Sequence, residues 1–86
     1  VEATMSKRTV WIIEGTSRQG EEEIAIYVRR RPKATFSGKV NWFTPWRDGA
    51  RPFKAADEAA RALKMGRAGD DVRWQTCRVV AVAVES

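Results

Sequence analysis

The sequence contains no histidine and a single cysteine, Cys77. Without histidine, the chain lacks the commonest general base and metal ligand of proteins, and neither a Cys–His pair nor a zinc site can form. One cysteine cannot make an intrachain disulfide, which fits the reducing cytosol. We therefore expect a cytoplasmic protein without a catalytic centre or metal site of these kinds.

Several motifs that mark enzymes are also missing. The sequence has no Walker A, GxGxxG or GxSxG pattern, and its carboxylates do not follow EF-hand spacing. The acidic clusters at 21–23 and 70–71 fall in expected loops and are interpreted as solvated turn charges. Cys77 is interpreted as a small buried hydrophobe, because a reactive thiol needs an exposed, electropositive setting. We expect a protein that is not an enzyme and holds no metal or cofactor.

Long apolar runs are absent as well. The longest covers residues 79–84, far short of the roughly 20 residues that span a bilayer, so we expect no membrane partner. The periodic pattern of side chains begins near Lys7. We expect residues 1–6 to be a flexible N-terminal segment and residues 7–86 to form a single α+β domain.

The sequence does supply enough apolar surface for one small core. The chain has 86 residues, 43% of them hydrophobic, and its four Trp and three Phe residues disfavour intrinsic disorder. A chain of this length buries only about 60–65% of its unfolded surface, so its stability should be modest. Both a monomer and a homodimer stay open.

Alternating apolar residues predict a hairpin at the start of the chain. Residues 8–14 are β-branched and aromatic on both faces, which predicts a strand in the interior of a sheet. A turn at 15–21 separates it from a second strand at 22–30, which has one apolar face. Pro32 lacks a backbone N–H and restrains Arg31, so we expect it to end this strand.

A third strand, a helix and a last strand complete the pattern. Residues 40–43 form a short strand with either the even-numbered or the odd-numbered side chains inward. Residues 55–65, rich in alanine and free of proline, form the one clear helix, with Gly66 as its left-handed C-terminal residue. Residues 72–85 form an interior strand with a bulge near 75–76. The expected fold is α+β in the order β-β-β-α-β, a small antiparallel three- or four-stranded sheet with one helix on one face.

Positive charge is concentrated in the middle of the chain. The formal net charge is +5, and residues 27–54 carry eight basic residues against one acid, Asp48. Arginine pairs with phosphate through two parallel hydrogen bonds, and an exposed tryptophan can stack on a base. The segment therefore predicts a nucleic-acid-binding surface. Its expected residues are Arg29, Arg30, Arg31, Lys33, Trp46, Arg47 and Arg51.

Other interpretations of this segment stay open. The arginines can instead serve only to keep an edge strand soluble. The aromatic residues Trp42, Phe43 and Trp46 either close one end of the core or, if Trp46 and Tyr27 are exposed together, form an interaction patch. The hypotheses are thus a small non-catalytic binding protein for DNA or RNA, or a protein–protein interaction or host-modulating factor with no nucleic-acid role.

The stretch from Lys39 to Leu63, with the strand after it, resembles known proteins. An aromatic strand is followed by a charged turn, Phe53, a helix that begins Ala-Ala-Asp-Glu-Ala, and a strand that ends in valines. This outline resembles short bacterial and phage or prophage accessory proteins. It more loosely resembles the arm-type DNA-binding domain of phage integrases. In that domain the helix follows a sequence motif, F-x-x-x-x-E-A, which is matched here by Phe53, Glu58 and Ala59. The resemblance implies DNA binding, although the arm-type domain ends with its helix and this chain continues into a strand.

Overall fold

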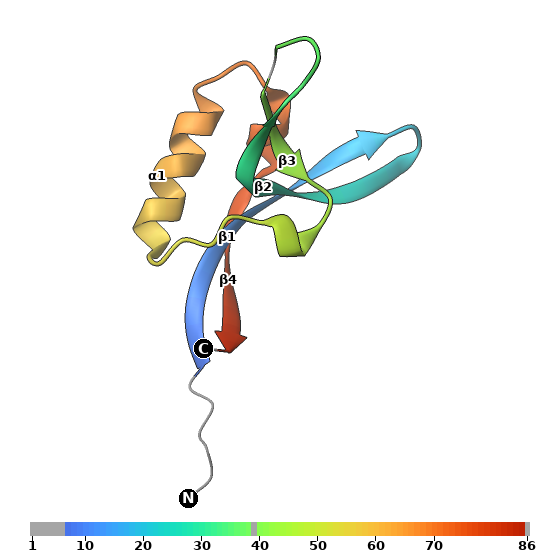
Figure 1. Ribbon diagram of the computed structural model, residues 1–86. Helices are drawn as coiled ribbons and strands as arrows, with labels where there is room; N and C mark the ends of the chain where they lie inside the picture. Colours follow the sequence, from blue (N-terminus) through green and yellow to red (C-terminus); the bar gives the residue numbers. More distant parts are fainter. Residues whose placement is uncertain (1–6, 39, 86) are drawn as a thin grey trace, which may run out of the picture.

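The computed structural model of the protein describes residues 7–38 and 40–85, so the expected flexible segment 1–6 lies outside the described residues. Within this range the strands are β1 (Lys7–Gln19), β2 (Glu22–Ala34), β3 (Val40–Thr44) and β4 (Arg78–Glu85). The same residues include the helix α1 (Ala56–Arg67) and two short 3-10 helices, η1 (Arg47–Gly49) and η2 (Val72–Thr76) (Figure 1). The strands form one four-stranded antiparallel sheet in the order β3-β2-β1-β4, which confirms the small α+β fold.

β1 lies in the interior of the sheet, as its two apolar faces predict. Residues 7–14 pair with β4, and residues 14–19 pair with β2. The expected turn at 15–21 is wrong, because β1 continues to Gln19 and the chain reverses at Gly20, whose φ of 64° suits glycine. Gly15 instead allows close packing, since a Cβ there would lie 2.5 Å from Cys77 Sγ.

β2 is longer than expected and continues through Pro32. It pairs with β3 at Tyr27 and Val28 and again at Lys33 and Ala34, with a shift of register between the two pairs. A bulge leaves strand residues without ladder partners, so a proline costs no sheet hydrogen bond there. The prediction that Pro32 ends the strand is therefore wrong. Pro32 lies instead within the second half of β2, which contains the bulge.

The segment 50–53 occupies the space where β1 and β2 separate. Ala50 forms a β-bridge with Arg29 of β2, and Phe53 forms one with Trp11 of β1. The Phe53 N–H donates to the Trp11 carbonyl at 2.7 Å, and the Trp11 N–H donates to the Phe53 carbonyl at 2.9 Å. This segment therefore connects the basic half of β2 to the start of α1.

α1 covers one face of the sheet and extends to Arg67, past its expected end. Its acidic first turn and basic last turn suit the helix dipole. Gly66 is not a left-handed C-terminal residue as expected. It lies within the helix, where a Cβ would overlap the ring of Trp74. Among residues 7–38 and 40–85, no helix has the length and apolar character needed to cross a bilayer.

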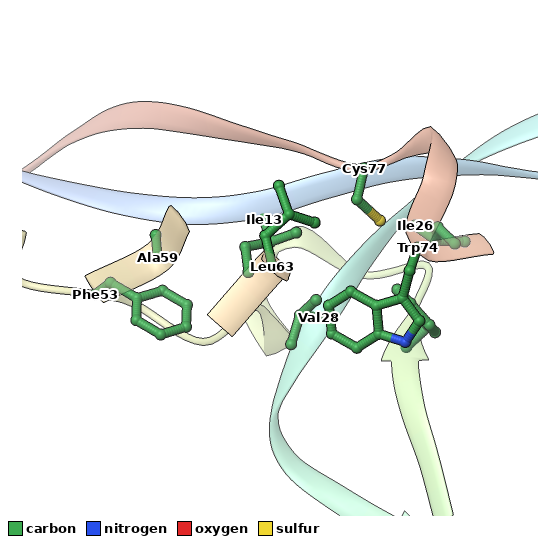
Figure 2. Close-up of a cluster of buried hydrophobic side chains, with 9 residues drawn as sticks. Ile13, Ile26, Val28, Phe53, Ala59, Leu63, Trp74 and Cys77 are labelled. Carbon is green, nitrogen blue, oxygen red and sulfur yellow. The ribbon is translucent and has the colours of Figure 1, made fainter. Parts of the chain in front are cut away.

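The main core lies between α1, η2 and one face of the sheet (Figure 2). Ile24 packs against this core, so the predicted apolar face of β2 is confirmed. Phe43 is buried and Trp42 is exposed, so the odd-numbered side of β3 faces inward. The cluster contains Ile13, Ile26, Val28, Phe43, Phe53, Ala59, Leu63, Trp74 and Cys77. A second, smaller cluster on the opposite face contains Ile12, Tyr27 and Ala50.

The segment 72–85 is not one interior strand. Residues 72–76 form η2, and β4 begins only at Arg78. β4 lies at the edge of the described sheet, although Val79 packs against the main core and Val80 against the second cluster. Apolar residues on both sides of a strand report burial above and below it. They do not report hydrogen bonding along both edges, which is why the prediction failed.

Candidate nucleic-acid interface

The predicted basic residues lie on two neighbouring elements. Four of them follow one another along the second half of β2, and Arg47 begins η1. Arg29 is half-exposed and the others are exposed. We call this set the basic surface: Arg29, Arg30, Arg31, Lys33 and Arg47.

Backbone contacts bring the two parts of the basic surface together. Ala50 pairs with Arg29, and the Ala50 N–H donates to the Arg47 carbonyl at 3.0 Å. The Arg29 Nε donates to the Arg31 carbonyl at 3.2 Å. Two backbone segments that carry these cations, far apart in the sequence, therefore meet where η1 contacts β2.

Acidic partners are not found for these cations in the described part of the chain. Among residues 8–38 and 40–84, whose side chains the structure describes, the ion pairs are Arg73–Asp71 at 2.6 Å and Arg78–Glu14 at 3.5 Å. Neither pair includes a residue of the basic surface. The adjacent positive charges therefore repel one another, and a bound anion would relieve that repulsion.

Trp46 is held next to the basic surface with its indole in solvent. Its side chain is 73% exposed. The Trp46 N–H donates to the Thr44 hydroxyl at 3.2 Å, and the Trp46 carbonyl accepts from the Gly49 N–H at 3.0 Å. Tyr27 is buried, so the interaction patch that required Trp46 and Tyr27 to be exposed together does not form.

Arg51 and the preceding residue, Ala50, lie on opposite sides of the sheet. Ala50 belongs to the cluster on one face of the sheet, whereas Arg51 lies on the main-core side. Its guanidinium carbon is 5.0 Å from the centroid of the Phe53 ring, within cation–π range. The structure thus divides the predicted residues between two faces, and Arg51 marks the place where the faces meet.

A cavity of about 510 Å³ opens beside Arg51. Its lining comes from β2, β3, α1, η2 and the loops around them, and is largely apolar. Trp42, Phe53 and Met65 contribute apolar walls, and Arg51 and Asp70 contribute opposite charges. No sequence motif predicts this cavity. The one signal in the sequence is Trp42, an aromatic residue on the outward-facing side of its strand.

An ion pair supports one wall of the cavity. The Arg73 guanidinium donates to both carboxylate oxygens of Asp71 and lies 4.6 Å from the centroid of the Phe43 ring. These hydrogen bonds lower the pKa of the Asp71 carboxyl and raise the pKa of Arg73. The Asp71 side chain also accepts from the Arg73 N–H, which caps η2. Asp71 is therefore a structural residue, and its interpretation as a solvated turn charge is wrong.

Two further contacts fix η2 against α1. Arg67, at the end of α1, donates to the Cys77 carbonyl at 2.7 Å and to the Trp74 carbonyl at 3.3 Å. Burial raises the pKa of the Cys77 thiol. Cys77 is 2% exposed, which confirms its interpretation as a small buried hydrophobe.

Comparisons of this protein with family models, with curated proteins and with solved structures find no match. The resemblance to phage accessory proteins and to arm-type DNA-binding domains therefore stays a prediction.

Proposed function

We propose that this protein is a non-catalytic module that binds the sugar–phosphate backbone of nucleic acid on its basic surface. One observation carries the proposal. The segments of β2 and η1 that carry the cations are in backbone contact, and none of these cations has an ion-pair partner among the described residues. Phosphate groups would supply the missing negative charge, and their displaced counterions would drive association.

The geometry suggests a division of roles. Arg31 and Lys33 are exposed two positions apart on β2 and would contact successive phosphates. Trp46 would stack on a base beside them, because its backbone is fixed and its indole is exposed. Contacts of these kinds bind many sequences alike, so we expect affinity with little sequence preference.

Fluorescence polarisation of labelled DNA and RNA at two salt concentrations tests this proposal. We expect a Kd below about 10⁻⁶ M at physiological salt and a steep loss of affinity as salt rises. Replacing Arg29, Arg30 and Arg31 with alanine should weaken binding to all sequences alike and make the salt dependence shallower.

A control with the same net charge isolates the site. Arg18, Arg61 and Lys64 are exposed on the β1–β2 hairpin and α1, outside the basic surface. Replacing these three with alanine should change affinity much less. Equal losses from the two triple variants would mean that only total charge matters and would contradict a defined surface.

The edge of β4 favours protein interaction as a second candidate function, including a homodimer. β4 has one neighbour in the described sheet, β1, and its sequence contains neither lysine nor proline. Such an edge can accept a strand from a partner. Sedimentation would show a dimer or a complex that Ala81→Lys dissociates, with nucleic-acid affinity unchanged. If the protein sediments as a monomer and captures no partner from nuclease-treated lysate, this second function is wrong.

A further inference from the structure

We infer that the cavity beside Arg51 takes one unpaired base of a single-stranded nucleic acid whose phosphates lie on the basic surface. The inference rests on the proposed function and narrows its ligand from nucleic acid in general to single strands. Three features of the cavity carry it: its aromatic walls, its connection to the basic surface, and its opposite charges.

The walls of the cavity are suited to stacking. Trp42 of β3 is 44% exposed and Met65 of α1 is 74% exposed, although both are large apolar side chains. Phe53 and Trp74 are buried and line the same cavity. Its volume of about 510 Å³ lies within the range of small-ligand sites. A planar, partly apolar ligand would cover the exposed surface of Trp42 and Met65.

Arg51 joins the cavity to the basic surface. Its N–H donates to the Val28 carbonyl at 2.8 Å, so its backbone is fixed to β2. The preceding residue, Ala50, pairs with Arg29 of the basic surface. Side chains alternate along a strand, so Arg30 lies on the same side of β2 as Val28, which also lines the cavity. A strand that places one phosphate on Arg51 can therefore place a neighbouring phosphate on Arg30 while its base enters the cavity. A base-paired strand cannot do so without losing its pairing.

Charged groups on the cavity wall favour a base over a purely apolar occupant. Arg51 can donate hydrogen bonds, and the Asp70 carboxylate can accept them. The neighbouring carboxylate, Asp71, already pairs with Arg73. An alkyl chain or an apolar side chain of a partner protein would remove water from Arg51 and Asp70 without replacing its hydrogen bonds. Every base carries hydrogen-bond acceptors on its edges and at least one N–H donor.

Gly69 offers a way to fill the cavity. It lines the cavity, its φ is not in the left-handed region, and a Cβ there would meet only the Gly66 carbonyl oxygen, at 3.4 Å. Gly69→Phe therefore adds a ring to the wall without a backbone clash, and Gly69→Ala is the matched control. Trp42→Ala removes a stacking surface by a different change.

The experiment compares three labelled probes by fluorescence polarisation: a single strand of about 12 nucleotides, its duplex, and an abasic strand with the same phosphates. The comparison is made in Trp46→Ala, which removes the stacking of a base beside the basic surface. We expect this variant to bind the single strand about tenfold more tightly than the abasic strand, the effect of one stacked base. Gly69→Phe and Trp42→Ala, each added to Trp46→Ala, should abolish this difference and leave the salt dependence unchanged. Gly69→Ala, added in the same way, should leave the difference unchanged.

The outcomes separate this inference from the proposed function. Equal affinity of Trp46→Ala for all three probes would overturn the cavity inference and leave binding on the basic surface intact. Unchanged probe preferences in Gly69→Phe and Trp42→Ala would also overturn it, as expected if the cavity takes an apolar side chain of a protein partner. No binding of any probe would refute the proposed function itself.

Discussion

The two halves of β2 obey different constraints. In the first half, Ile26 and Val28 point into the main core, and residues 22–27 pair with β1. In the second half, residues 30–34 are all exposed, and a bulge interrupts the pairing with β3. Burial determines the residue types of the first half. In the second half, none of residues 30–34 is buried, so these side chains can vary for function without loss of the core.

Two alanine substitutions in β2 should have very different effects on stability. Ile26 is 4% exposed, so Ile26→Ala removes buried methyl groups and leaves a void. We expect a loss of about 2–5 kcal/mol in the free energy of unfolding. Arg30→Ala, four residues later, should change it by less than about 0.5 kcal/mol. Urea titration measures both, and similar losses would mean that the second half also depends on burial.

A substitution in α1 tests whether the core side of β2 depends on the fit of the helix against η2. Alanine at Gly66 would gain about 1 kcal/mol from helix propensity. Its Cβ would overlap the buried Trp74 ring, however, and such overpacking costs about 1–3 kcal/mol. We expect a net loss of stability, seen as a lower Tm. A higher Tm would show that the Trp74 ring can shift away from the added Cβ without a loss of packing.

Comparison of these regions also shows what the sequence could reveal. Side-chain alternation identified the buried faces of β1 and β2, because a period of two directly encodes the side of a strand. It could not show that β4 is an edge, since strand neighbours are not encoded in alternation. It could not show why Gly66 is glycine, because the reason is a ring eight residues later in the chain.

The candidate site can be predicted from the sequence only in part, because sequence patterns encode local properties and not contacts between distant segments. Clustered arginines along one strand are a local property, so the basic segment was apparent. The position of Arg51 on the other side of the sheet from Ala50 depends on the path of 50–53 between β1 and β2. The cavity is assembled from elements far apart in the chain, and its walls come together only in the folded protein.

Replacing the proline in the bulge between the two halves of β2 should have a small effect on the free energy of unfolding. Pro32 restricts the unfolded chain and lies where the strand lacks regular pairing. Pro32→Ala should therefore lower stability by about 0.4–1 kcal/mol, through the entropy of the unfolded state. Urea unfolding measures this loss. A loss well above about 1 kcal/mol would mean that Pro32 also stabilises the folded strand directly.

The smallest expected effect is on the pH dependence of stability. It should differ between a variant that removes the ion pair of Arg73 and a variant that removes arginines without an ion-pair partner. Hydrogen bonds from Arg73 lower the folded-state pKa of Asp71 below its usual value. A carboxyl of this kind contributes stability that is present above its unfolded-state pKa of about 3.9 and is lost as the pH falls through the folded-state pKa. Asp71→Asn removes this contribution, so its stability curve should approach that of the wild type in acid. The Asp71 side chain is 34% exposed, so the difference in stability between Asp71→Asn and the wild type near neutral pH should be small.

Alanine at Arg29, Arg30 and Arg31 should instead give a stability curve parallel to that of the wild type, since no described carboxylate pairs with them. Urea unfolding from acid to neutral pH measures all three curves. If the arginine variant also converged with the wild type in acid, the basic surface would have a carboxylate partner, and phosphate would have to compete with it.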